Sequence, residues 1–394
     1  MAKRTGGFIG QDGLNAPDQA TGVTGTAGDA QVEVSFTAPT DVGGAAITGY
    51  RVQDSTGAFG ASGSSSPVTV AGLTNGTSYT FNVWAINPFG WSSPSDASGS
   101  VNPFSSRGVF AGGIESSLVN TIEFVQIPTL GNVTDFGDLT AAKEQLSGLG
   151  SSTRGVYVGG NTGSTTNVIE YITFASAGNG IDFGNIHTAK EGVGTLSNDT
   201  RGLYAGGNTS NDNIEFITIA NTGNGTDFGD LSQGRMQMNA AASPTRGIFA
   251  GGSAGTGGSS LNKIDYVTIG STGNAIDFGD LTVGRNRTNG GCSSGTRAVF
   301  GGGFDDNTNT SKNTIDYVTI ASTGNATDFG DLLAARQFLT SCSSNVRGLF
   351  GGGQTTNQIQ YITIATTGSA TDFGDLSASR RELASASNSH GGIS

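Results

Sequence analysis

Six arginines recur along the chain, and each is followed, after one small residue, by an aliphatic residue, an aromatic residue and then a glycine pair. They are Arg107, Arg154, Arg201, Arg246, Arg297 and Arg347. In five copies a carboxylate follows on the next apolar segment, at Glu123, Glu170, Glu215, Asp265 and Asp316. Carboxylates can bind metals or transfer protons, but a residue present in every copy serves what all copies share. We therefore expect structural arginines that pair with backbone carbonyls or with the strand carboxylates.

Other residues that commonly carry catalysis are sparse in this sequence. The chain has two histidines, His187 and His390, and two cysteines, Cys292 and Cys342. Copper-radical oxidation needs several histidines, and the Ser-x-Asp-x-Gly-x-x-Trp turn of sialidases is absent. The cysteines stand at equivalent positions in successive copies, where leucine or alanine occurs elsewhere, so we interpret them as small apolar fillers. The sequence predicts no catalytic residue, no metal site and no cofactor, and therefore a protein that is not an enzyme.

The copies differ in length mainly in the connection after each glycine pair. The most polar of these connections contains Asp305, Asp306, Asn307 and Asn309. Variable loops on a repeated scaffold form its adaptable face. These four residues are the candidate ligand-facing loop, either as a weak site for a cation or a sugar hydroxyl or as a plain solvated loop.

The repeat period indicates the elements that position these residues. The arginine spacings are 47, 47, 45, 51 and 50 residues, close to the roughly 50 residues of kelch units. Each copy continues into an apolar strand, then into Asp-Phe-Gly-Asp or a near variant, and five residues later reaches Lys143 or its equivalent. Four strands per unit, a glycine pair after the second and a basic residue before the first resemble the kelch motif, with phenylalanine where the family has an outer tryptophan. The resemblance implies a six-bladed β-propeller.

The two ends of the repeated region complement each other. The first copy begins at Arg107 with no small-residue strand before it, whereas the last copy is followed by a surplus strand within residues 380–387. Pairing of these ends satisfies the edge backbone groups that an open array exposes. We therefore expect the C-terminal strand to close the propeller.

The first hundred residues carry a different pattern, with period-2 alternation between glycine-rich turns. Leu73, Gly76, Thr77 and Tyr79 resemble the tyrosine corner of immunoglobulin-type sandwiches. From about residue 16 to residue 102 the chain resembles a fibronectin type III domain, with Phe36 where the family has a buried tryptophan. We therefore predict an all-β protein with an N-terminal arm, a fibronectin type III-like β-sandwich and a kelch-like propeller, with the boundaries 1–15, 16–103 and 104–394.

The predicted sandwich has an unusually apolar exterior. Because side chains alternate along a strand, burial of Phe81 turns Trp84 and Ile86 outward, where Phe89 and Trp91 join them. Two interpretations stay open. Neighbouring strands or the second domain cover these side chains, or the four residues form a docking patch for another chain.

Composition excludes several classes of partner. The chain of 394 residues has a net charge of −12 and five lysines, which leaves no basic stripe for a phosphate backbone. We expect no nucleic-acid partner. No apolar run reaches the length of a membrane span, and the N-terminus lacks the apolar core of a secretory signal. Two cysteines cannot form a disulfide framework, which favours folding in a reducing cytoplasm.

The sandwich, the Gly- and Asn-rich repeats and the opening sequence at residues 3–10 together resemble virion structural proteins of marine tailed phages. The resemblance implies a virion protein that is assembled in the host cytoplasm, is present in several copies, and contacts other virion proteins and a host surface glycan or protein. Three functions stay open: a tail fibre or tail-associated adhesin, a capsid decoration or appendage protein, and a glycan-active enzyme. The missing acid pair and metal ligands disfavour the enzyme, and the adhesin is our prediction.

Overall fold

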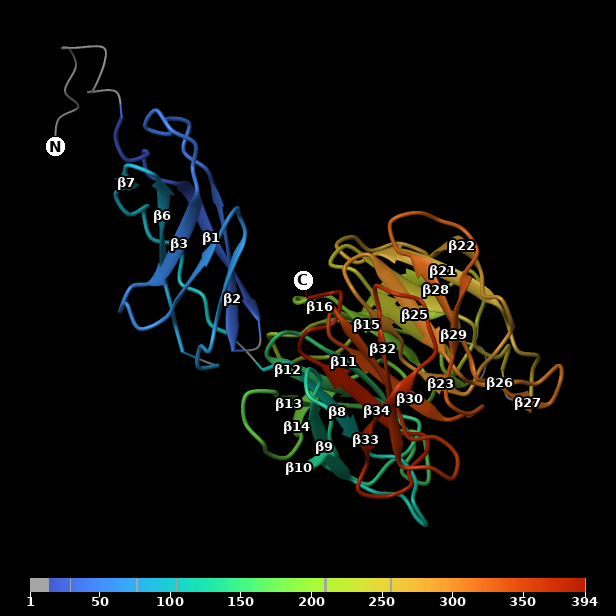
Figure 1. Ribbon diagram of the computed structural model, residues 1–394. Coiled ribbons are helices and arrows are strands. Elements are labelled where there is room, and N and C mark those ends of the chain that lie inside the picture. The colour runs from blue at the N-terminus through green and yellow to red at the C-terminus, as the bar shows by residue number, and fades with distance from the viewer. Residues whose placement is uncertain are drawn as a thin grey trace. The chain divides into compact units, whose positions relative to one another are not determined.

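The computed structural model describes residues 14–28, 30–75, 77–103, 105–208, 211–255 and 257–393. Within these ranges the regular elements are β-strands, so the protein belongs to the all-β class (Figure 1). The chain forms two compact units, residues 1–105 and residues 106–394. Among the described residues there is no helix with the length and hydropathy needed to cross a membrane.

Two antiparallel sheets form the N-terminal unit. One sheet contains β1 (Thr21–Gly28), β2 (Gln31–Thr37) and β5 (Val68–Ala71). The other has the strand order β4 (Gly60–Gly63), β3 (Gly49–Asp54), β6 (Phe81–Asn87) and β7 (Gly90–Trp91). Alternate residues of β2, β3 and β6 are buried, because successive side chains point to opposite faces of a strand. The unit therefore has one core between its sheets.

The features that the sequence analysis expected in this core are present. The Tyr79 hydroxyl accepts a hydrogen bond from the backbone N–H of Thr74 at 3.1 Å, which is the contact of a tyrosine corner. Phe36 is buried and packs against Tyr50 with ring centroids 4.7 Å apart. An aromatic side chain thus fills the place of the missing tryptophan.

A period-three serine ladder covers the edge of β6 instead of a regular strand. The hydroxyl groups of Ser92, Ser95 and Ser98 accept hydrogen bonds from the backbone N–H groups of Ala85, Val83 and Phe81 at 2.9–3.0 Å. The three serine N–H groups donate in turn to the carbonyls of the same β6 residues at 2.9 Å. Every polar backbone group on this edge is therefore paired without a β-ladder, which leaves less free edge for another chain to pair with.

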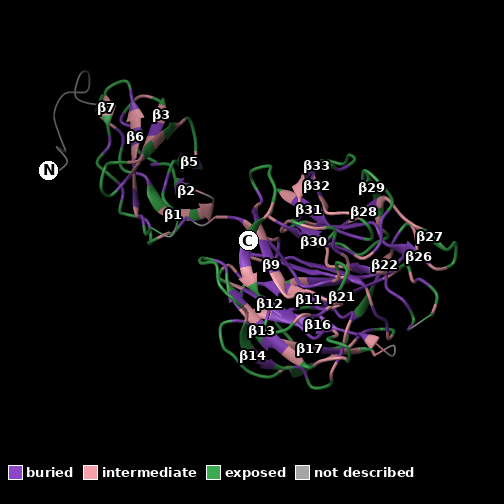
Figure 2. Cartoon of the chain, turned by 90° about the horizontal axis from the view of Figure 1, so that it is seen from below, coloured by how far each residue is buried: buried purple, intermediate pink, exposed green. Residues whose placement is uncertain are grey.

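The second unit contains six sheets whose strands follow one another in sequence, and Figure 2 shows that these strands are mostly buried whereas the connections are exposed. The first strands of the sheets are β34 (Ala384–Ser387), β11 (Ser147–Gly150), β15 (Gly194–Ser197), β19 (Asn239–Ala242), β24 (Cys292–Ser293) and β30 (Leu339–Ser343). The second strands begin at the repeated arginines and are β8 (Arg107–Ala111), β12 (Arg154–Val158), β16 (Arg201–Ala205), β20 (Arg246–Ala250), β25 (Arg297–Gly301) and β31 (Arg347–Gly351).

The third and fourth strands of each sheet lie farther from the first strand. The third strands are β9 (Thr121–Gln126), β13 (Val168–Thr173), β17 (Asn213–Thr218), β21 (Lys263–Thr268), β28 (Thr314–Thr319) and β32 (Gln358–Thr363). The fourth strands are β10 (Thr134–Asp138), β14 (Ile181–Asn185), β18 (Thr226–Asp230), β22 (Ile276–Asp280), β29 (Thr327–Asp331) and β33 (Thr371–Asp375).

The first strands of the six sheets contact one another in a closed cycle. The order of contact is β34, β11, β15, β19, β24, β30 and again β34. The expected pairing of the two ends is present, because β34 pairs antiparallel with β8 from Ala384 opposite Ala111 to Ser387 opposite Gly108. The C-terminal strand thus completes the sheet that begins at Arg107.

The fifth sheet departs from the regular pattern. Its first strand is interrupted at Gly290 and Gly291, so that β24 pairs with β25 while β23 (Thr288–Asn289) pairs in parallel with β30 of the sixth sheet. The connection after its glycine pair folds into a short hairpin of β26 (Phe304–Asp305) and β27 (Thr310–Ser311). The fifth copy therefore contributes irregular backbone on two sides of its sheet.

The repeated arginines join each sheet to the next one through backbone carbonyls. Arg154 donates to the carbonyls of Ile219 and Ala220 at 2.9 and 2.8 Å, and its guanidinium lies 4.4 Å from the ring of Tyr171 on its own sheet. The same arrangement holds at Arg107, Arg201, Arg246, Arg297 and Arg347. Backbone carbonyls and strand carboxylates were the two expected partners of these arginines, and in the structure the arginines bind the carbonyls.

The strand carboxylates bind a different repeated cation, which stands five residues after the Asp-Phe-Gly-Asp segment. Arg285 and Asp316 form an ion pair at 2.8 Å, and both side chains are completely buried. Equivalent pairs join Lys143 to Glu170, Lys190 to Glu215, Arg235 to Asp265 and Arg380 to Glu123. In the sixth copy Gln360 replaces the acid, and Arg336 donates to the carbonyls of Gly352 and Gln358.

The Asp-Phe-Gly-Asp segment packs sheet against sheet. Phe136 is buried and meets Phe124 edge to face at 5.8 Å. Gly137 has φ +148°, and a β-carbon there would lie 2.5 Å from the carbonyl oxygen of Gly178 in the neighbouring copy. Glycine is required because another backbone occupies the space of a side chain.

Candidate functional site

Six equivalent residues, each two positions after the repeated cation, have left-handed backbone conformation. They are Gln145, Gly192, Gln237, Arg287, Phe338 and Glu382, with φ values of 50°, 62°, 52°, 55°, 59° and 55°. We name these six residues the rim. Non-glycine residues rarely adopt positive φ, and a bulky residue such as phenylalanine does so least readily. One backbone geometry therefore presents four different side chains, with glutamine at two positions, and one glycine that has no side chain.

Backbone hydrogen bonds link the rim residues to one another across the sheets. Gln237 N donates to Gly192 O, Gly192 N to Gln145 O and Gln145 N to Glu382 O, at 2.7, 2.9 and 2.9 Å. Glu382 N then donates to Phe338 O at 3.0 Å, and Phe338 N donates to Arg287 O at 2.6 Å. Residues that are up to 237 positions apart in the sequence (382 against 145) are thus gathered at one end of the cycle of first strands.

The rim surrounds a pocket of about 360 Å³, which we name the rim pocket. Five rim residues line it together with Glu191, Met236, Ser253, Asn286 and Asp306 from the adjoining connections. A smaller cavity of about 30 Å³ lies next to it and is lined by Thr288, Asn289 and Leu339. The volume of the rim pocket lies in the range of small-molecule sites.

The side of the rim pocket formed by the first, second and third sheets is acidic. Gln145 Nε2 donates to Glu382 Oε2 at 2.9 Å, and Asn161 Nδ2 donates to Glu191 Oε2 at 2.6 Å. Glu144 lies directly behind the rim and shares a hydrogen bond with Glu382. Burial, together with the neighbouring carboxylates of Glu382 and Glu191, raises the pKa of Glu144 to about 7.

The opposite side of the rim pocket is organised around Arg287. Its guanidinium pairs with Asp306 at 3.3 Å and donates to Gln337 Oε1 at 2.9 Å. It also lies over the rings of Phe304 and Phe338, at 4.1 and 5.5 Å from their centroids. These contacts fix the arginine and neutralise its charge locally.

Several buried polar atoms around the pocket have no hydrogen-bond partner among the described residues. They include Asn286 Oδ1, Thr288 Oγ1 and Gln145 Oε1. Asn286 is 2% exposed, and its Nδ2 donates to Asp306 Oδ2. A buried acceptor without a donor costs about 1–3 kcal/mol. Each of these atoms is enclosed by protein and has almost no accessible surface.

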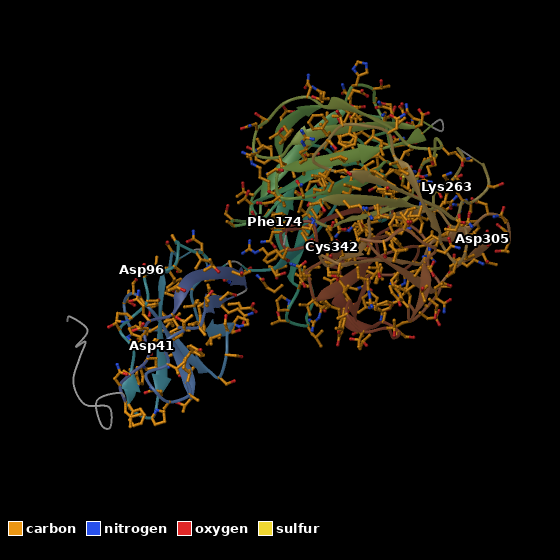
Figure 3. The ribbon with its side chains drawn as sticks, turned by 90° about the horizontal axis from the view of Figure 1, so that it is seen from above. Asp41, Asp96, Phe174, Lys263, Asp305 and Cys342 are labelled. Atoms are coloured by element: carbon orange, nitrogen blue, oxygen red, sulfur yellow. The ribbon has the colours of Figure 1, made fainter. Side chains whose placement is uncertain are left out.

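The candidate ligand-facing loop lies in the β26–β27 hairpin, and Figure 3 shows Asp305 at the edge of the repeat unit. Asp305 is buried and binds Lys312 at 3.2 Å and Thr308 Oγ1 at 2.8 Å. Although burial acts to raise the pKa of Asp305, its hydrogen bonds to Thr308, Lys312 and the Asn307 N–H hold it below the usual value. Of the four residues, Asp306 lines the rim pocket, while Asn307 and Asn309 are exposed.

The carboxylates of this loop already have protein donors, which leaves little for a cation to bind. Within the described residues no group of three or more His, Cys, Asp or Glu side chains could hold a metal ion. Asp305 is held by Lys312, and Asp306 by Arg287, Asn286 and Ser260. The loop contributes to the ligand-binding geometry mainly through Asp306.

A side chain of the fifth copy, which lines the smaller cavity, bridges two other sheets. Asn289 Nδ2 donates to the carbonyls of Leu146 and Leu383 at 2.6 and 3.3 Å, and these residues directly follow two rim positions of other sheets. Asn289 O accepts a hydrogen bond from Thr340 Oγ1 at 3.0 Å.

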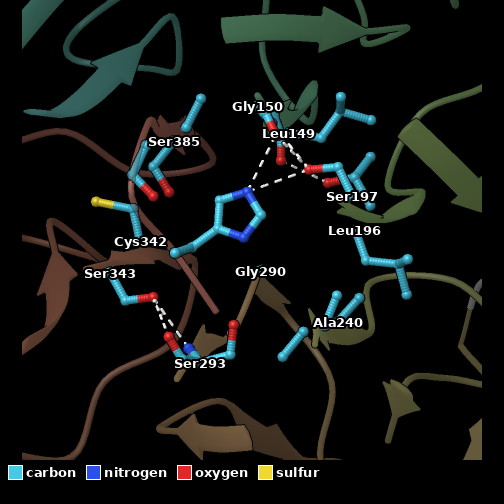
Figure 4. Close-up of a pocket in the computed structure, with 18 of the residues that line it drawn as sticks. Leu149, Gly150, Leu196, Ser197, Ala240, Gly290, Ser293, Cys342, Ser343 and Ser385 are labelled. Atoms are coloured by element: carbon cyan, nitrogen blue, oxygen red, sulfur yellow. Dashed lines mark hydrogen bonds between the residues drawn. The ribbon is translucent and has the colours of Figure 1, made fainter. Parts of the chain in front are cut away.

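A third cavity, of about 40 Å³, is lined by the first strands of all six sheets (Figure 4). Ser197 Oγ donates to Gly150 O at 2.6 Å and accepts from Gly150 N at 3.1 Å. The His390 ring lies 3.2 Å from Ser197 Oγ, with Nδ1 accepting the Gly392 N–H and Nε2 facing the Gly150 carbonyl at 3.0 Å. Nε2 therefore carries the proton, so it cannot accept one from Ser197, and this contact is a structural hydrogen bond.

The remaining histidine and the cysteines also have structural environments. His187 is exposed, and its backbone N–H donates to Glu215. Cys292 Sγ donates to the carbonyl of Cys342 at 3.4 Å, and both thiols are free and buried. Burial raises the pKa of the Cys342 thiol to about 12, which keeps it protonated and a poor nucleophile.

Comparison with known proteins assigns the first unit. Residues 16–100 match the family described as Fibronectin type III domain. The N-terminal unit is a fibronectin type III domain. Comparison with curated proteins gives no match. Among solved structures, the chain is similar to one titled "Structure of YjhT", with a TM-score of 0.53 and 11% identity, over 67% of this chain and 96% of that chain. At this identity the likeness concerns the fold alone.

The fibronectin type III domain carries the predicted docking patch on the outer face of β6 and β7. Ile86 pairs with Trp91 across these strands, and Trp84 lies on the same face. Phe89 and Trp91 are 46% and 57% exposed, whereas Trp84 and Ile86 are half-buried. Trp84, Ile86 and Trp91 thus lie on one face, and Phe89 lies in the turn between the two strands.

The rim was not found from the sequence, although a signal for it exists. The six rim residues follow the repeated cation at a fixed distance of two positions, and they differ in chemistry from copy to copy. A binding site on a repeated scaffold is expected where copies depart from one another. Differences in loop length are visible in the sequence, whereas a single-residue difference at a position with constant backbone conformation changes no spacing.

Proposed function

We propose that the six sheets are the blades of a kelch-like β-propeller and that the protein is a non-enzymatic adhesin of a bacteriophage particle, which binds its ligand in the rim pocket. The rim carries this proposal, because five of its six equivalent backbone positions line one pocket and present Gln, Gln, Arg, Phe and Glu. The cycle of first-strand contacts and the pairing of β34 with β8 support a closed propeller.

Binding without catalysis agrees with the geometry of the carboxylates. Glycosidases hold their two carboxyl groups about 5–10 Å apart across the scissile bond. Glu144 and Glu382 instead share a hydrogen bond, and Asp306 is paired with Arg287. We therefore assign these groups to recognition.

The fibronectin type III domain supplies an attachment surface in this proposal. Trp84, Ile86, Phe89 and Trp91 form an apolar patch on which another virion protein can dock. The acidic composition and the two buried free cysteines suit a protein that folds in the host cytoplasm and then resides on a particle outside it.

The test of the adhesin proposal uses the purified full chain and intact host cells. Saturable binding that is lost in the double variant Arg287→Ala, Phe338→Ala, and kept in the control Glu115→Gln, supports the proposal. Binding that the rim substitutions leave unchanged overturns it. Electron microscopy of labelled particles distinguishes a tail location from a capsid appendage. Incorporation of the Trp84→Ser, Trp91→Ser variant at the wild-type level would remove the docking role of the patch.

A further inference from the structure

We propose that the side chains of Lys190 and Asn213 join in an intramolecular amide bond, with Glu215 as the proton carrier. The reaction modifies the chain itself, and it depends neither on the rim pocket nor on the proposed adhesin function. The inference is drawn from three groups that meet at the third sheet: a buried amine, a carboxamide that accepts its hydrogen bond, and a buried carboxylate beside the amine.

The three side chains meet at the start of β17. Lys190 lies in the connection between β14 and β15, and its side chain is 3% exposed. Its Nζ donates to Asn213 Oδ1 at 3.3 Å and to Glu215 Oε1 at 3.2 Å. Asn213 and Glu215 are two residues apart on β17, so their side chains point to the same face of the strand. The amine therefore reaches the carboxamide and the carboxylate at once.

Neighbouring groups hold the carboxamide and the carboxylate in this orientation. Asn213 Nδ2 donates to Asp227 Oδ1 at 2.9 Å, which turns the carbonyl oxygen of the amide toward the amine. Glu215 Oε2 accepts hydrogen bonds from the buried Tyr204 hydroxyl at 2.8 Å and from the backbone N–H of His187 at 3.0 Å. The other carboxylate oxygen, Oε1, faces the amine. Groups fixed in this way react with a high effective concentration.

The reaction balances without an oxidant or a second substrate. The Lys190 ammonium first passes a proton to Glu215 Oε1, which leaves a neutral amine and a neutral carboxylic acid, and burial lowers the cost of this neutral pair because it penalises both charges. The Nζ lone pair then forms a bond to Asn213 Cγ, and the Cγ–Nδ2 bond breaks. Two of the three Nζ protons reach Nδ2 through Glu215, so the leaving nitrogen departs as ammonium and the carboxylate is restored.

A pocket beside the three groups gives the leaving nitrogen a way out. It has a volume of about 380 Å³ and is lined by Lys190, Asn213 and Glu215 together with His187 and Asp227. Because His187 and Asp227 are exposed, the pocket opens to solvent. Ammonium can therefore diffuse away, which makes the new amide bond irreversible in practice.

The third sheet differs from the other five at this site. In the second sheet Lys143 pairs with Glu170 in the same way, but Val168 stands at the position of Asn213 and offers no carbonyl carbon. The other four copies have arginine in place of the lysine, and a guanidinium stays charged and is a poor nucleophile. One copy alone thus combines lysine, carboxamide and carboxylate, as expected of a site that the shared scaffold does not require.

Mass spectrometry of the denatured full chain and of its tryptic peptides tests the proposal. We expect a mass lower by one ammonia than the sequence gives, and a peptide pair in which residues 155–201 are joined to residues 202–235 through Lys190 and Asn213. Trypsin should not cleave after Lys190, whereas it should cleave completely after Lys143, the internal control. An unchanged mass with complete cleavage after Lys190 overturns the proposal. Loss of ammonia without joined peptides also overturns it, because cyclisation at an Asn-Gly pair gives the same mass.

Variants separate the chemistry from packing. Asn213→Asp replaces the carboxamide with a carboxyl group, so the linked chain should be lighter than its own sequence mass by one water. Lys190→Arg should abolish the link, and the exposed control Asn221→Asp should keep it with loss of one ammonia. Joined peptides that persist in Lys190→Arg would overturn the proposal.

Glu215→Gln tests the proton carrier. It should slow the linkage about a hundredfold or more, followed by mass after cell-free synthesis of the full chain. Linkage at the wild-type rate would overturn the role of Glu215. If this variant does not fold, the comparison of Asn213→Asp with Asn221→Asp still decides whether the amide bond forms, because both leave the buried pair of Lys190 and Glu215 in place.

Discussion

The contacts between sheets and the rim pocket are built on the same repeat but use it in opposite ways. Between sheets, the arginines at the start of each second strand bind carbonyls of the next sheet, and buried cations bind strand carboxylates in nearly every copy. At the rim, the backbone is equally regular, with φ between 50° and 62°, but apart from two glutamines the side chains differ in chemistry. Repeated side chains therefore indicate packing, whereas different side chains on a repeated backbone indicate recognition.

The fibronectin type III domain also contains a repeated side chain that has a structural role. Ser92, Ser95 and Ser98 recur every third residue, and each satisfies one backbone N–H of β6. The regular spacing again accompanies a structural role. The comparison between repeated and variable positions thus makes predictions for both units.

The largest effect should come from removing the strand that closes the cycle. Truncation after Glu382 deletes β34 and buried Leu383, which leaves the edge of β8 unpaired. We expect the repeat unit to lose its cooperative unfolding transition in calorimetry, while the fibronectin type III domain keeps its own. A shorter truncation that removes residues 391–394 retains β34 and should keep both transitions. Two intact transitions in the longer truncation would contradict the role of β34.

The next largest effect should come from a buried repeated ion pair. Arg285→Met leaves the Asp316 carboxylate buried without its cation, which should destabilise the repeat unit by about 3–5 kcal/mol. The partly exposed Lys263, 3.8 Å from Asp277, provides the control, because Lys263→Met should cost less than about 1 kcal/mol. Denaturant titrations measure both. The double variant Arg285→Met, Asp316→Leu should regain most of the loss, and failure to do so would show that the arginine acts mainly through packing.

A smaller effect is expected at the serine ladder. Ser95→Ala removes the acceptor of the buried Val83 N–H and should cost about 1–2 kcal/mol in the fibronectin type III domain. The exposed Ser93→Ala serves as the control and should be neutral within about 0.5 kcal/mol. Urea unfolding followed by tryptophan fluorescence reports this domain, because Trp84 and Trp91 both lie in it. Equal midpoints for the two variants would remove the structural role of the ladder.

The smallest effect is expected at Glu144 behind the rim, and it should depend on pH. Its pKa of about 7 in the folded state exceeds the ordinary value of 4.5, so the carboxylate lowers the stability of the fold progressively as pH rises from about 4.5 to 7. Glu382 and Glu191 raise the pKa, and Arg381 opposes them. Because Glu144 is partly exposed, Glu144→Gln should stabilise the repeat unit by only about 1 kcal/mol at pH 8 and by nothing at pH 4.5.

Denaturation midpoints at the two pH values measure this difference, with Glu115→Gln as the control. A destabilising effect of Glu144→Gln at pH 8 would show that the ionised carboxylate is a structural partner. The rim would then resemble the contacts between sheets, and the contrast between the two regions would fail.

Much of the fold could be predicted from the sequence, because it depends on local patterns. The alternation of β6, the tyrosine corner at Tyr79 and the pairing of the surplus C-terminal strand with β8 are present in the structure. These features follow from the two-residue period of strands and from the need to pair every buried backbone group. A repeat also reveals its ends, since a missing strand at one end and an extra strand at the other are visible in the sequence.

The candidate site could be predicted only in part. Asp306 was found because it lies in the most polar variable loop, and it does line the rim pocket. The contacts of Asp305 could not be predicted, because nothing in the sequence shows that Lys312 and Thr308 bind its carboxylate. The sequence also did not decide which group binds each strand carboxylate. Every copy contains two candidates, the arginine at the start of the second strand and the second repeated cation.

The sequence by itself determined the two units, the period of the repeat and the strand that joins its ends, because these depend on the order and spacing of apolar residues. The tertiary structure alone decided that Gln145, Gln237, Arg287, Phe338 and Glu382 line one pocket. Residues about 50 positions apart become neighbours only when the sheets meet, where backbone hydrogen bonds join one rim residue to the next.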